Sequence, residues 1–223
     1  MRVVVRLAVA ALIAAALAAC KAEPDKAAAG HVAEADRDGD DDQTLFDRER
    51  QPEVIIKALA LEPGMVVADV GAGTGLLTVH VARAVSPGGR VVATDIDGAV
   101  LEYLRSRMIA AGYDHSVEGR VVTPTEPGLE DGRYDAILLA QVDHYFDDRV
   151  GWLTKVRPAL APGGKLAIVN RMHHRSASLA AADAAGFQLV TEISDIPGQY
   201  VAVFQAKASA PTPPPPPATK ASP

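Results

Sequence analysis

Short apolar runs alternate along the chain with longer segments in which apolar residues recur every three or four positions. A continuous apolar run predicts a buried strand, and the wider spacing predicts a helix with one buried face. The predicted strands are 66–68, 91–94, 121–123, 134–140, 166–169, 187–193 and 200–204. The predicted helices are 52–61, 76–85, a helix between Asp97 and Gly112, 150–160 and 176–185.

Strand and helix patterns follow one another in turn, which is typical of a parallel sheet with helices on both faces. Only the last two strands lack room for a helix between them, so one of the two must run antiparallel. The sequence therefore predicts an α/β fold. Its sheet is doubly wound and mostly parallel, with seven strands and one antiparallel strand near the C-terminus.

Residues 1–19 are predicted to be a secretory signal peptide, because two arginines precede an apolar stretch too short to span a bilayer comfortably. The segment 17–20, Leu-Ala-Ala-Cys, resembles the bacterial lipobox, which implies cleavage before Cys20 and lipidation of that residue. Lys21 favours the outer membrane, so we expect a lipid-anchored protein on the periplasmic side of the cell envelope. An ordinary signal peptide or a short anchor helix is the alternative.

Two segments of biased composition flank a predicted domain at 45–207. Residues 20–44 are rich in Ala, Asp and Glu without an apolar period, which predicts a flexible acidic linker. The alternating acids at 36, 38 and 40 are similar to a calcium loop, but Asp41 and Asp47 stand where such a loop requires Gly and Glu. Residues 208–223 contain five consecutive prolines, which predict a disordered tail or a ligand for a proline-recognising partner.

The chain is acidic, with 22 basic and 28 acidic residues and a formal net charge of −6. Removal of residues 1–19 takes away two arginines, so 20 basic and 28 acidic residues remain and the net charge becomes −8. This balance argues against nucleic acid as a partner, because such binding depends on neutralising phosphates. Cys20 is the only cysteine and leaves none for a disulfide, so the domain must be stable through its core alone.

The most informative motif follows the first predicted strand, where the chain reads D-x-G-x-G-x-G with Asp69, Gly71, Gly73 and Gly75. Glycines let a backbone turn tightly and approach a ligand, and the helix after them directs free N–H groups toward it. The motif therefore predicts a nucleotide-type cofactor site at the carboxyl end of the strand. A dinucleotide fingerprint would need glycine where Leu76 stands, which disfavours a nicotinamide oxidoreductase.

This spacing resembles the first motif of class I S-adenosylmethionine-dependent methyltransferases. The segments 48–54, 160–165, 185–187 and 197–200 are similar to a small bacterial subgroup of that family, so the resemblance covers residues 46–206. It implies a Rossmann-like fold and S-adenosyl-L-methionine as the cofactor. The residues it implies as cofactor-binding are Asp69, Gly71, Ala72, Gly73, Thr74, Gly75, Asp95, Ile96, Glu126 and Gln141.

In that family the acid at the end of the second strand binds both ribose hydroxyls, and the apolar residue after it packs on the adenine. The resemblance gives these roles to Asp95 and Ile96. The alternative is that Asp95 caps the next helix together with Asp97. The chain departs from the family elsewhere, because only Glu126 remains of an acidic pair and only His144 remains of a Tyr-His pair. A tryptophan expected near the first helix is also missing.

Gln141, Asp143 and His144 follow the fourth strand, at the sheet edge where ligands bind. Methyl transfer from a sulfonium depends on alignment in a water-poor pocket, and it needs a general base only for a protonated acceptor. Asp143 and His144 are the candidate catalytic residues, with one of them as the base. Alternatively, His144 caps the following segment while Tyr145 and Phe146 enter the core.

Three further histidines are candidates for a role at the site. His173 and His174 follow the fifth strand, but neighbours in an extended segment point to opposite sides, so no metal site is predicted. Either ring remains a candidate for the acceptor pocket. His80 lies beside the apolar face of the helix after the glycine loop and is expected to be exposed or partly packed.

Three functions stay open. The first is a methyltransferase that acts on an unidentified acceptor, a small molecule or a protein, and is anchored to the membrane through Cys20. The second is a catalytically inactive S-adenosylmethionine-binding or structural envelope lipoprotein, because this cofactor is made in the cytoplasm and its supply outside the inner membrane is in doubt. The third is an oxidoreductase. The intact glycine loop with Asp95 favours the first.

Overall fold

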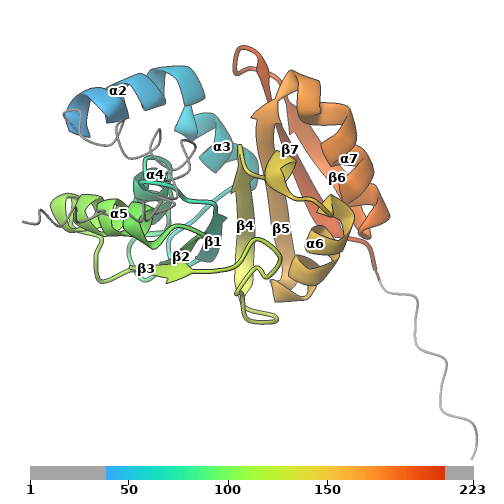
Figure 1. Ribbon diagram of the computed structural model, residues 1–223, viewed down its shortest axis with the longest axis horizontal. Coiled ribbons are helices and arrows are strands. Elements are labelled where there is room, and N and C mark those ends of the chain that lie inside the picture. Colours follow the sequence, from blue (N-terminus) through green and yellow to red (C-terminus); the bar gives the residue numbers. More distant parts are fainter. Residues whose placement is uncertain (1–38, 209–223) are drawn as a thin grey trace, which may run out of the picture. The chain divides into compact units, whose positions relative to one another are not determined.

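The computed structural model describes residues 39–208, all within one compact unit of the chain (Figure 1). The helices are α2 (Gly39–Arg50), α3 (Pro52–Leu59), α4 (Thr78–Val85), α5 (Gly98–Ala111), α6 (Arg149–Val156) and α7 (Arg175–Ala184). The strands are β1 (Val66–Val70), β2 (Arg90–Asp95), β3 (Val117–Val121), β4 (Tyr134–Ala140), β5 (Leu160–Arg171), β6 (Phe187–Ile193) and β7 (Gln199–Ala206). Short 3-10 helices are η1 (Asp143–Tyr145), η2 (Arg157–Ala159) and η3 (Met172–His174).

The strands form one seven-stranded sheet in the order β3-β2-β1-β4-β5-β7-β6. The pairs among β1 to β5 are parallel, whereas β7 runs antiparallel to both of its neighbours, β5 and β6. The prediction of a mostly parallel sheet with one antiparallel strand near the C-terminus is confirmed. The strand order reverses between β1 and β4, and open α/β sheets bind ligands at the carboxyl ends of the strands at such a point.

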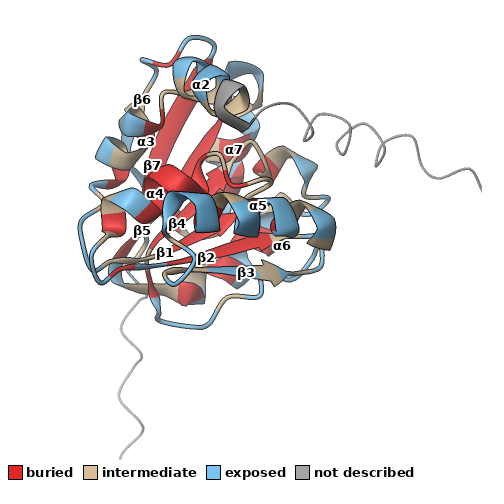
Figure 2. Cartoon of the chain, turned by 90° about the vertical axis from the view of Figure 1, so that its left-hand side faces the viewer, coloured by how far each residue is buried: buried red, intermediate tan, exposed pale blue. Residues whose placement is uncertain are grey.

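Helices cover both faces of the sheet. Helices α3 and α4 pack on one face, where Val81 lies in an apolar cluster with Leu138 of β4. Helices α6 and α7 pack on the other face, where Leu153 lies in a second cluster with Leu139. Neighbouring residues of a strand point to opposite faces, so Leu138 and Leu139 reach different clusters. Figure 2 shows the central strands buried between these layers.

Strand β3 spans 117–121 and not the predicted 121–123. It pairs with β2 from Val91 opposite Val117 to Asp95 opposite Val121. Only one face of this edge strand meets a helix, and Glu118 and Arg120 lie on the other face. The strand therefore has no apolar run, and backbone pairing with β2 determines its position more than its composition does.

The connection from β3 to β4, residues 122–133, contains no helix, although every residue in it is described. We expected strands and helices to alternate throughout except at the last two strands, although no individual helix was predicted between residues 123 and 134, and the structure has none there. On the sheet face opposite α5, Arg120 donates to Glu118 over 2.6 Å and to both carboxylate oxygens of Glu130 over 2.9 Å. The Tyr134 hydroxyl also donates to Glu130. A charged cluster therefore lies where strict alternation would place a crossover helix.

The hydrogen-bond donors of this cluster favour the ionised form of Glu130. Hydrogen bonds from Arg120 and then from Tyr134 stabilise the carboxylate and lower the pKa of Glu130 to about 2. Burial, followed by the bond to Glu130, raises the pKa of Tyr134 to about 12. Glu118, Arg120 and Glu130 are thus charged at neutral pH, whereas Tyr134 keeps its proton and donates to Glu130 as a neutral hydroxyl.

Helix α2 begins inside the segment 20–44 that the sequence assigned to a flexible linker, so the linker prediction is wrong for residues 39–44. Gln43 explains the difference, because its amide donates to the carbonyl of Leu76 over 3.0 Å and to Asp47 over 2.7 Å. The contacts of Gln43 with a distant segment hold the first part of this helix, and such polar contacts leave no apolar period in the sequence. Phe46, further along α2, packs against the apolar cluster that contains Val81.

Several sequence predictions fall outside the described residues. These are the signal peptide at 1–19, Cys20, the linker up to residue 38 and the proline-rich tail from residue 209. Among residues 39–208, no helix has the length and apolar content needed to cross a membrane.

Candidate functional site

The glycine loop joins the carboxyl end of β1 to helix α4. The backbone N–H groups of Gly71 and Ala72 donate to the carbonyl of Thr94 over 2.8 and 3.0 Å, which ties the loop to the end of β2. Gly71, Gly73 and Gly75 all have positive φ angles, of 67°, 56° and 84°. Glycine adopts this left-handed backbone without the strain that a side chain would add.

The three glycines differ in what surrounds them. A Cβ atom at Gly71 would lie 2.6 Å from Cγ2 of Val142, and one at Gly75 would lie 2.9 Å from Cγ of Leu104. A Cβ atom at Gly73 would meet no atom within 4 Å. Gly71 and Gly75 therefore leave room for the side chains of Val142 and Leu104, which pack against them. Gly73 faces open space that is wide enough for a ligand.

Asp95 lies at the end of β2 and contacts this loop. Its Oδ2 accepts a hydrogen bond from the N–H of Gly73 over 2.9 Å, and its Oδ1 accepts one from the N–H of Asp97 over 3.1 Å. Asp97 caps α5 by accepting from Ala99, so the capping role belongs to Asp97. Each carboxylate oxygen of Asp95 keeps a further lone pair for a ligand hydroxyl. Ile96, the next residue, is 61% exposed.

Asp69 lies beneath the loop and is only 2% exposed. The Thr78 hydroxyl donates to its Oδ2 over 2.7 Å. Burial raises the pKa of Asp69 to about 6, although the hydrogen bond from Thr78 acts in the opposite direction. The side chain therefore supports the turn between β1 and α4 from inside the protein.

Other predicted cofactor residues lie at different depths around the loop. The carbonyl of Thr74 accepts from Nε of Arg107 over 3.0 Å. Ala72 is partly buried against the cluster under α5. Glu126 lies at the surface, 63% exposed, and its carboxylate is 2.6 Å from Nζ of Lys155. Glu126 is thus paired with a lysine, and only its remaining lone pairs are open to a ligand.

Gln141 follows β4 and has a left-handed backbone, with φ of 59°. Its side-chain amide donates to Oε1 of Gln199 over 3.2 Å. The same oxygen accepts from Nη1 of Arg50 over 2.9 Å, and Nε2 of Gln199 donates to the carbonyl of Glu49. Gln199, the first residue of the antiparallel strand β7, thus joins the end of α2 to the carboxyl end of β4.

Helix α2 is also bonded to the glycine loop. His80 of α4 is only 6% exposed, contrary to the sequence expectation, and its Nε2 lies 2.7 Å from Oδ1 of Asp47. Nη1 of Arg107 donates to Oε1 of Gln43 over 3.2 Å, while its Nε holds the loop carbonyl of Thr74. These contacts connect α2, α4 and α5 around the loop.

Asp143 is fully buried, with 0% of its surface exposed. Its carboxylate accepts from Asn170 over 2.6 Å and from the Ser178 hydroxyl, and Nε of Arg149 lies 3.3 Å from it. A general base must reach the acceptor, so the geometry does not support Asp143 as that base. Asp143 instead fixes the positions of Asn170, Ser178 and Arg149 through its buried carboxylate.

His144 is half-buried, and Asn170 determines its protonation. Oδ1 of Asn170 accepts from the N–H of Arg171 over 2.8 Å, so its Nδ2 must face Asp143 and His144. Nδ2 lies 2.9 Å from Nδ1 of His144, which makes Nδ1 the acceptor and places the ring proton on Nε2. Burial and the neighbouring His174 lower the pKa of His144. Neutral His144 therefore presents an N–H donor.

A small stack of rings extends from His144. Its ring lies 4.4 Å from that of His174, nearly parallel at 14°, and 4.0 Å from that of Tyr145. The rings of His173 and His174 are 3.9 Å apart, because both residues lie in the 3-10 helix η3 and not in an extended segment. In the part of the chain that the structure describes, no three His, Cys, Asp or Glu side chains form a group that could hold a metal ion.

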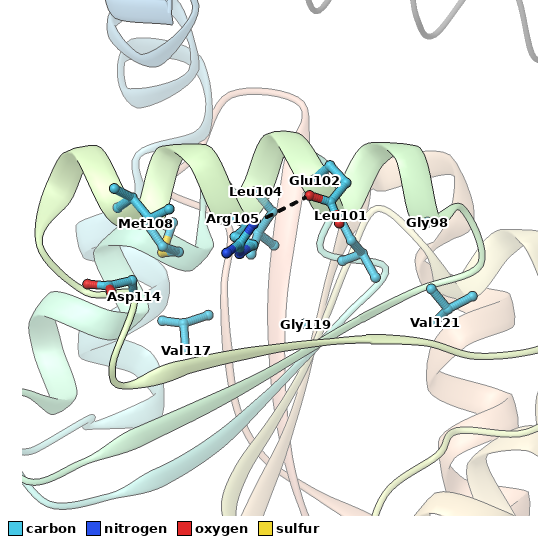
Figure 3. A pocket seen from close by; sticks show the side chains of 11 residues that line it. Gly98, Leu101, Glu102, Leu104, Arg105, Met108, Asp114, Val117, Gly119 and Val121 are labelled. Carbon is cyan, nitrogen blue, oxygen red and sulfur yellow. Dashed lines mark ion pairs between the residues drawn. The ribbon is translucent and has the colours of Figure 1, made fainter.

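A separate hollow lies between α5 and β3 (Figure 3). It has a volume of about 470 Å³, and the ion pair between Glu102 and Arg105 stands at its rim. Gly119 of β3, which has no side chain, and Leu101 of α5 are among the residues that line it. None of the predicted cofactor residues lines it.

Sequence reasoning missed several residues that organise the site. Asn170 is a fully buried polar residue in the apolar strand β5, and that position alone was a usable signal. Gln199 and Arg50 carried no such signal, because they meet from positions 149 residues apart in the chain. Arg107 looked like an ordinary surface residue of a helix.

Comparison with known proteins agrees with this geometry. Residues 68–166 match a family model described as a methyltransferase domain. The ubiquinone/menaquinone biosynthesis C-methyltransferase UbiE of Hahella chejuensis is 29% identical over 106 residues, which cover 48% of this chain and 43% of that protein. The highly reducing polyketide synthase PKS2 of Leptosphaeria maculans is 31% identical over 127 residues, which cover 53% of this chain and 5% of the synthase. This chain thus spans less than half the length of these curated relatives.

Solved structures share the fold at low sequence identity. A SAM dependent methyltransferase from Aquifex aeolicus has a TM-score of 0.66 and 21% identity, with 75% of this chain and 97% of that chain covered. The [4+2]-cyclase SpnF has a TM-score of 0.64 and 14% identity, with 72% and 82% covered. The described residues therefore have the Rossmann-like fold of class I S-adenosylmethionine-dependent methyltransferases, and residues 68–166 match the methyltransferase domain by sequence.

Proposed function

We propose that this protein is an S-adenosylmethionine-dependent methyltransferase that acts on an unidentified acceptor. The observation that carries the proposal is the 2.9 Å hydrogen bond from Gly73 to Asp95. It brings the glycine loop and the candidate ribose acid together at the carboxyl ends of β1 and β2, next to the point between β1 and β4 where the strand order reverses. The open space beside Gly73 supplies room for the cofactor at that place.

The residues present fit this cofactor. S-adenosylmethionine supplies an electrophilic methyl group on a sulfonium. Asp95 would accept hydrogen bonds from the ribose hydroxyls, and the exposed side chain of Ile96 would pack on the adenine. The turn at 71–75 would hold the remainder through its backbone. Glu126, which is paired with Lys155, would meet the adenine amine only at the surface.

The acceptor side of the proposed site is built from β4 and β5. His144 presents Nε2–H, which has no hydrogen-bond partner among residues 39–208, so it would orient an acceptor oxygen and not take its proton. Burial and the neighbouring His173 lower the pKa of His174, so that ring is neutral at pH 7 and able to accept a proton. Asp143 would act only through Asn170 and Ser178 as a positioning residue.

A binding or structural protein without catalysis is the second candidate. Burial of Asp143 favours it, because that removes one of the two expected catalytic residues from contact with a substrate. The [4+2]-cyclase SpnF has the same fold, and a fold alone does not establish a reaction.

We also propose that the protein is a lipoprotein of the cell envelope, lipid-anchored on the periplasmic side of the outer membrane. The segment 17–20 and Lys21 support this proposal by sequence alone. Palmitate labelling of the wild type and of Cys20→Ser tests it. Labelling that is lost in the variant is the expected result, and equal labelling of both would refute the anchor.

Calorimetric titration of the full chain with S-adenosylmethionine tests the cofactor. Asp95→Ala should weaken binding about 100-fold, because two hydrogen bonds to a charged group are worth about 3 kcal/mol or more. Asp114→Ala, in the exposed turn after α5, should change nothing. Absence of binding to the wild type at millimolar ligand would sink the cofactor assignment. Release of S-adenosylhomocysteine in the presence of candidate acceptors then separates an enzyme from a binding protein.

A further inference from the structure

We propose that Arg50 and Arg171 form a binding site for an anionic group, a carboxylate, on the methyl acceptor. This inference rests on the proposed function, because it names the chemical class of the acceptor. The two arginines lie on α2 and β5, and neither belongs to the predicted cofactor residues.

Gln199 connects Arg50 to the end of β5 that carries Arg171. It lies directly opposite Arg171 in the antiparallel ladder between β5 and β7, so both side chains start from the same face of the sheet. Oε1 of Gln199 accepts from Nη1 of Arg50 over 2.9 Å. Arg50 is therefore held beside Arg171 by a glutamine that is only 7% exposed.

The pair lacks a carboxylate partner. Among the side chains of residues 42–208, no Asp or Glu oxygen lies within 4.0 Å of either guanidinium. Glu49, the acid next to Arg50, is paired with Arg48 at 3.7 Å and is 60% exposed. The carboxylate of Asp143 is ion-paired with Nε of Arg149 at 3.3 Å. Two adjacent cations without an ion-paired carboxylate are unusual in a protein whose formal net charge is −6.

The excess of positive charge lowers the pKa values of neighbouring groups. Burial and the nearby Arg171 lower the pKa of Arg50, while Glu49 raises it. Arg149 and Arg171 both contribute to lowering the pKa of His174, against which Asp143 acts. An anion bound between these groups would relieve the repulsion and would raise the pKa of His174.

The position of the pair assigns it to the acceptor. Asp95 at β2 and the glycine loop at β1 mark the cofactor, and Arg171 lies two strands beyond β1 on the other side. Adjacent strands are about 4.8 Å apart, so the arginine lies about 10 Å from the loop along the sheet edge. The exposed side chains of Tyr145 and Met172 lie on the same side and offer contact to an apolar or aromatic body.

Benzoate and its uncharged analogue benzamide are suitable probes. Titration of the full chain, followed by NMR of the His174 ring, should show benzoate binding at least tenfold more tightly than benzamide and raising the pKa of His174. Arg171→Gln should weaken benzoate about tenfold and leave benzamide unchanged, because only benzoate gains a charge-assisted hydrogen bond. Arg90→Gln removes the same charge at the amino end of β2 and should change neither.

Three outcomes would overturn the proposal. One is equal affinity for benzoate and benzamide in the wild type, and another is benzoate affinity that does not respond to Arg171→Gln. The third is a result in which Arg171→Gln binds S-adenosylmethionine more weakly than the wild type does, but binds methylthioadenosine, which lacks the carboxylate, with unchanged affinity. That result would assign the arginines to the cofactor. Titration of the wild type with S-adenosylmethionine alone tests the proposed function separately.

Discussion

The side-chain amide of Asn170 donates a hydrogen bond to Nδ1 of His144 over 2.9 Å, and this contact determines which ring nitrogen of His144 carries the proton. The amide cannot turn round without placing its oxygen against the carboxylate of Asp143. His144 is thereby held as a hydrogen-bond donor through Nε2. A base at this site must be another group or the acceptor must already be deprotonated.

Asn170→Ala should reverse the tautomer of His144. Without the amide, Nδ1 faces only the carboxylate of Asp143, so the proton moves to Nδ1 and the pKa of His144 rises. Long-range proton–nitrogen NMR of the imidazole reads both quantities. Ser178→Ala is the control, because it removes a donor from Asp143 without touching His144. Nδ1–H in the wild-type ring would contradict the assignment.

Gly73→Ala and Gly71→Ala should separate cofactor binding from folding. A methyl group at residue 73 meets no atom within 4 Å, so the variant should fold with a cost of about 1 kcal/mol from its positive φ. The methyl group would occupy the space assigned to S-adenosylmethionine, whose affinity should fall at least tenfold. At residue 71 it lies 2.6 Å from Val142, so that variant should lose stability first. Thermal melting and calorimetry distinguish the two, and unaltered affinity in Gly73→Ala would remove the cofactor from this position.

Asp69→Asn should stabilise the protein at neutral pH. The folded pKa of about 6 is above the unfolded value of 3.8, so ionisation of the buried carboxylate opposes folding as pH rises between these values. The gain should be up to about 3 kcal/mol above pH 6 and should disappear near pH 4. Urea unfolding at several pH values measures it. Thr78→Val removes the hydroxyl that bonds Asp69 and should have the opposite sign. A loss of stability in Asp69→Asn at pH 7 would refute this account.

The sequence predicted the parts of this fold that depend on local patterns. Strands β1, β2 and β4 are apolar runs. The spacing of the glycines pointed to Asp95, and the structure brings the two together through the hydrogen bond from Gly73. Strand β3 was displaced, because exposed Glu118 and Arg120 interrupt its apolar residues. Its position depends on pairing with β2, which no local pattern reports.

The acceptor side could not be predicted for a related reason. Asp143 and His144 follow an apolar strand, as ligand-binding residues do, but burial of Asp143 depends on Asn170 and Ser178, which lie 27 and 35 residues further along the chain. Residues 39–44 of helix α2 were taken for a linker, because the contact that holds them is polar and runs from Gln43 to Leu76, 33 residues away. Long-range polar contacts leave no period in a sequence.

Glu130→Gln should destabilise the protein slightly at neutral pH. The folded pKa of about 2 is below the ordinary 4.5, so the stabilising contribution is present above pH 4.5 and is lost as pH falls toward 2. Glu130 is 43% exposed, and solvent screening limits the loss at pH 7 to less than about 1 kcal/mol. Urea unfolding at pH 7 and pH 2 measures the difference, which 1 M salt should reduce. Glu102→Gln breaks an exposed pair at 3.9 Å and should have no effect. An equal effect of the two variants would show that the charged cluster contributes nothing.

Asp47→Asn should loosen helix α2 without unfolding the sheet. Asp47 Oδ1 accepts from Gln43 and lies 2.7 Å from Nε2 of the buried His80, so one carboxylate oxygen joins α2 to α4. Loss of charge at that oxygen should raise local opening at least tenfold, since hydrogen bonds to charged groups are worth about 1.5–3 kcal/mol. Hydrogen exchange of amides 43–50 should accelerate accordingly, while that of β1 and β4 stays unchanged.

The matched control for helix α2 is Glu53→Gln. Its carboxylate lies 4.0 Å from Nδ1 of His80 and is 79% exposed, so it should not alter exchange in α2. Because Gln43 also contacts Leu76 and Arg107 beside the glycine loop, a loosened α2 should weaken S-adenosylmethionine binding in Asp47→Asn but not in Glu53→Gln. Unchanged exchange in Asp47→Asn would mean that Arg50 and Gln199 hold the helix from its other end, and that the contact between Asp47 and His80 is incidental.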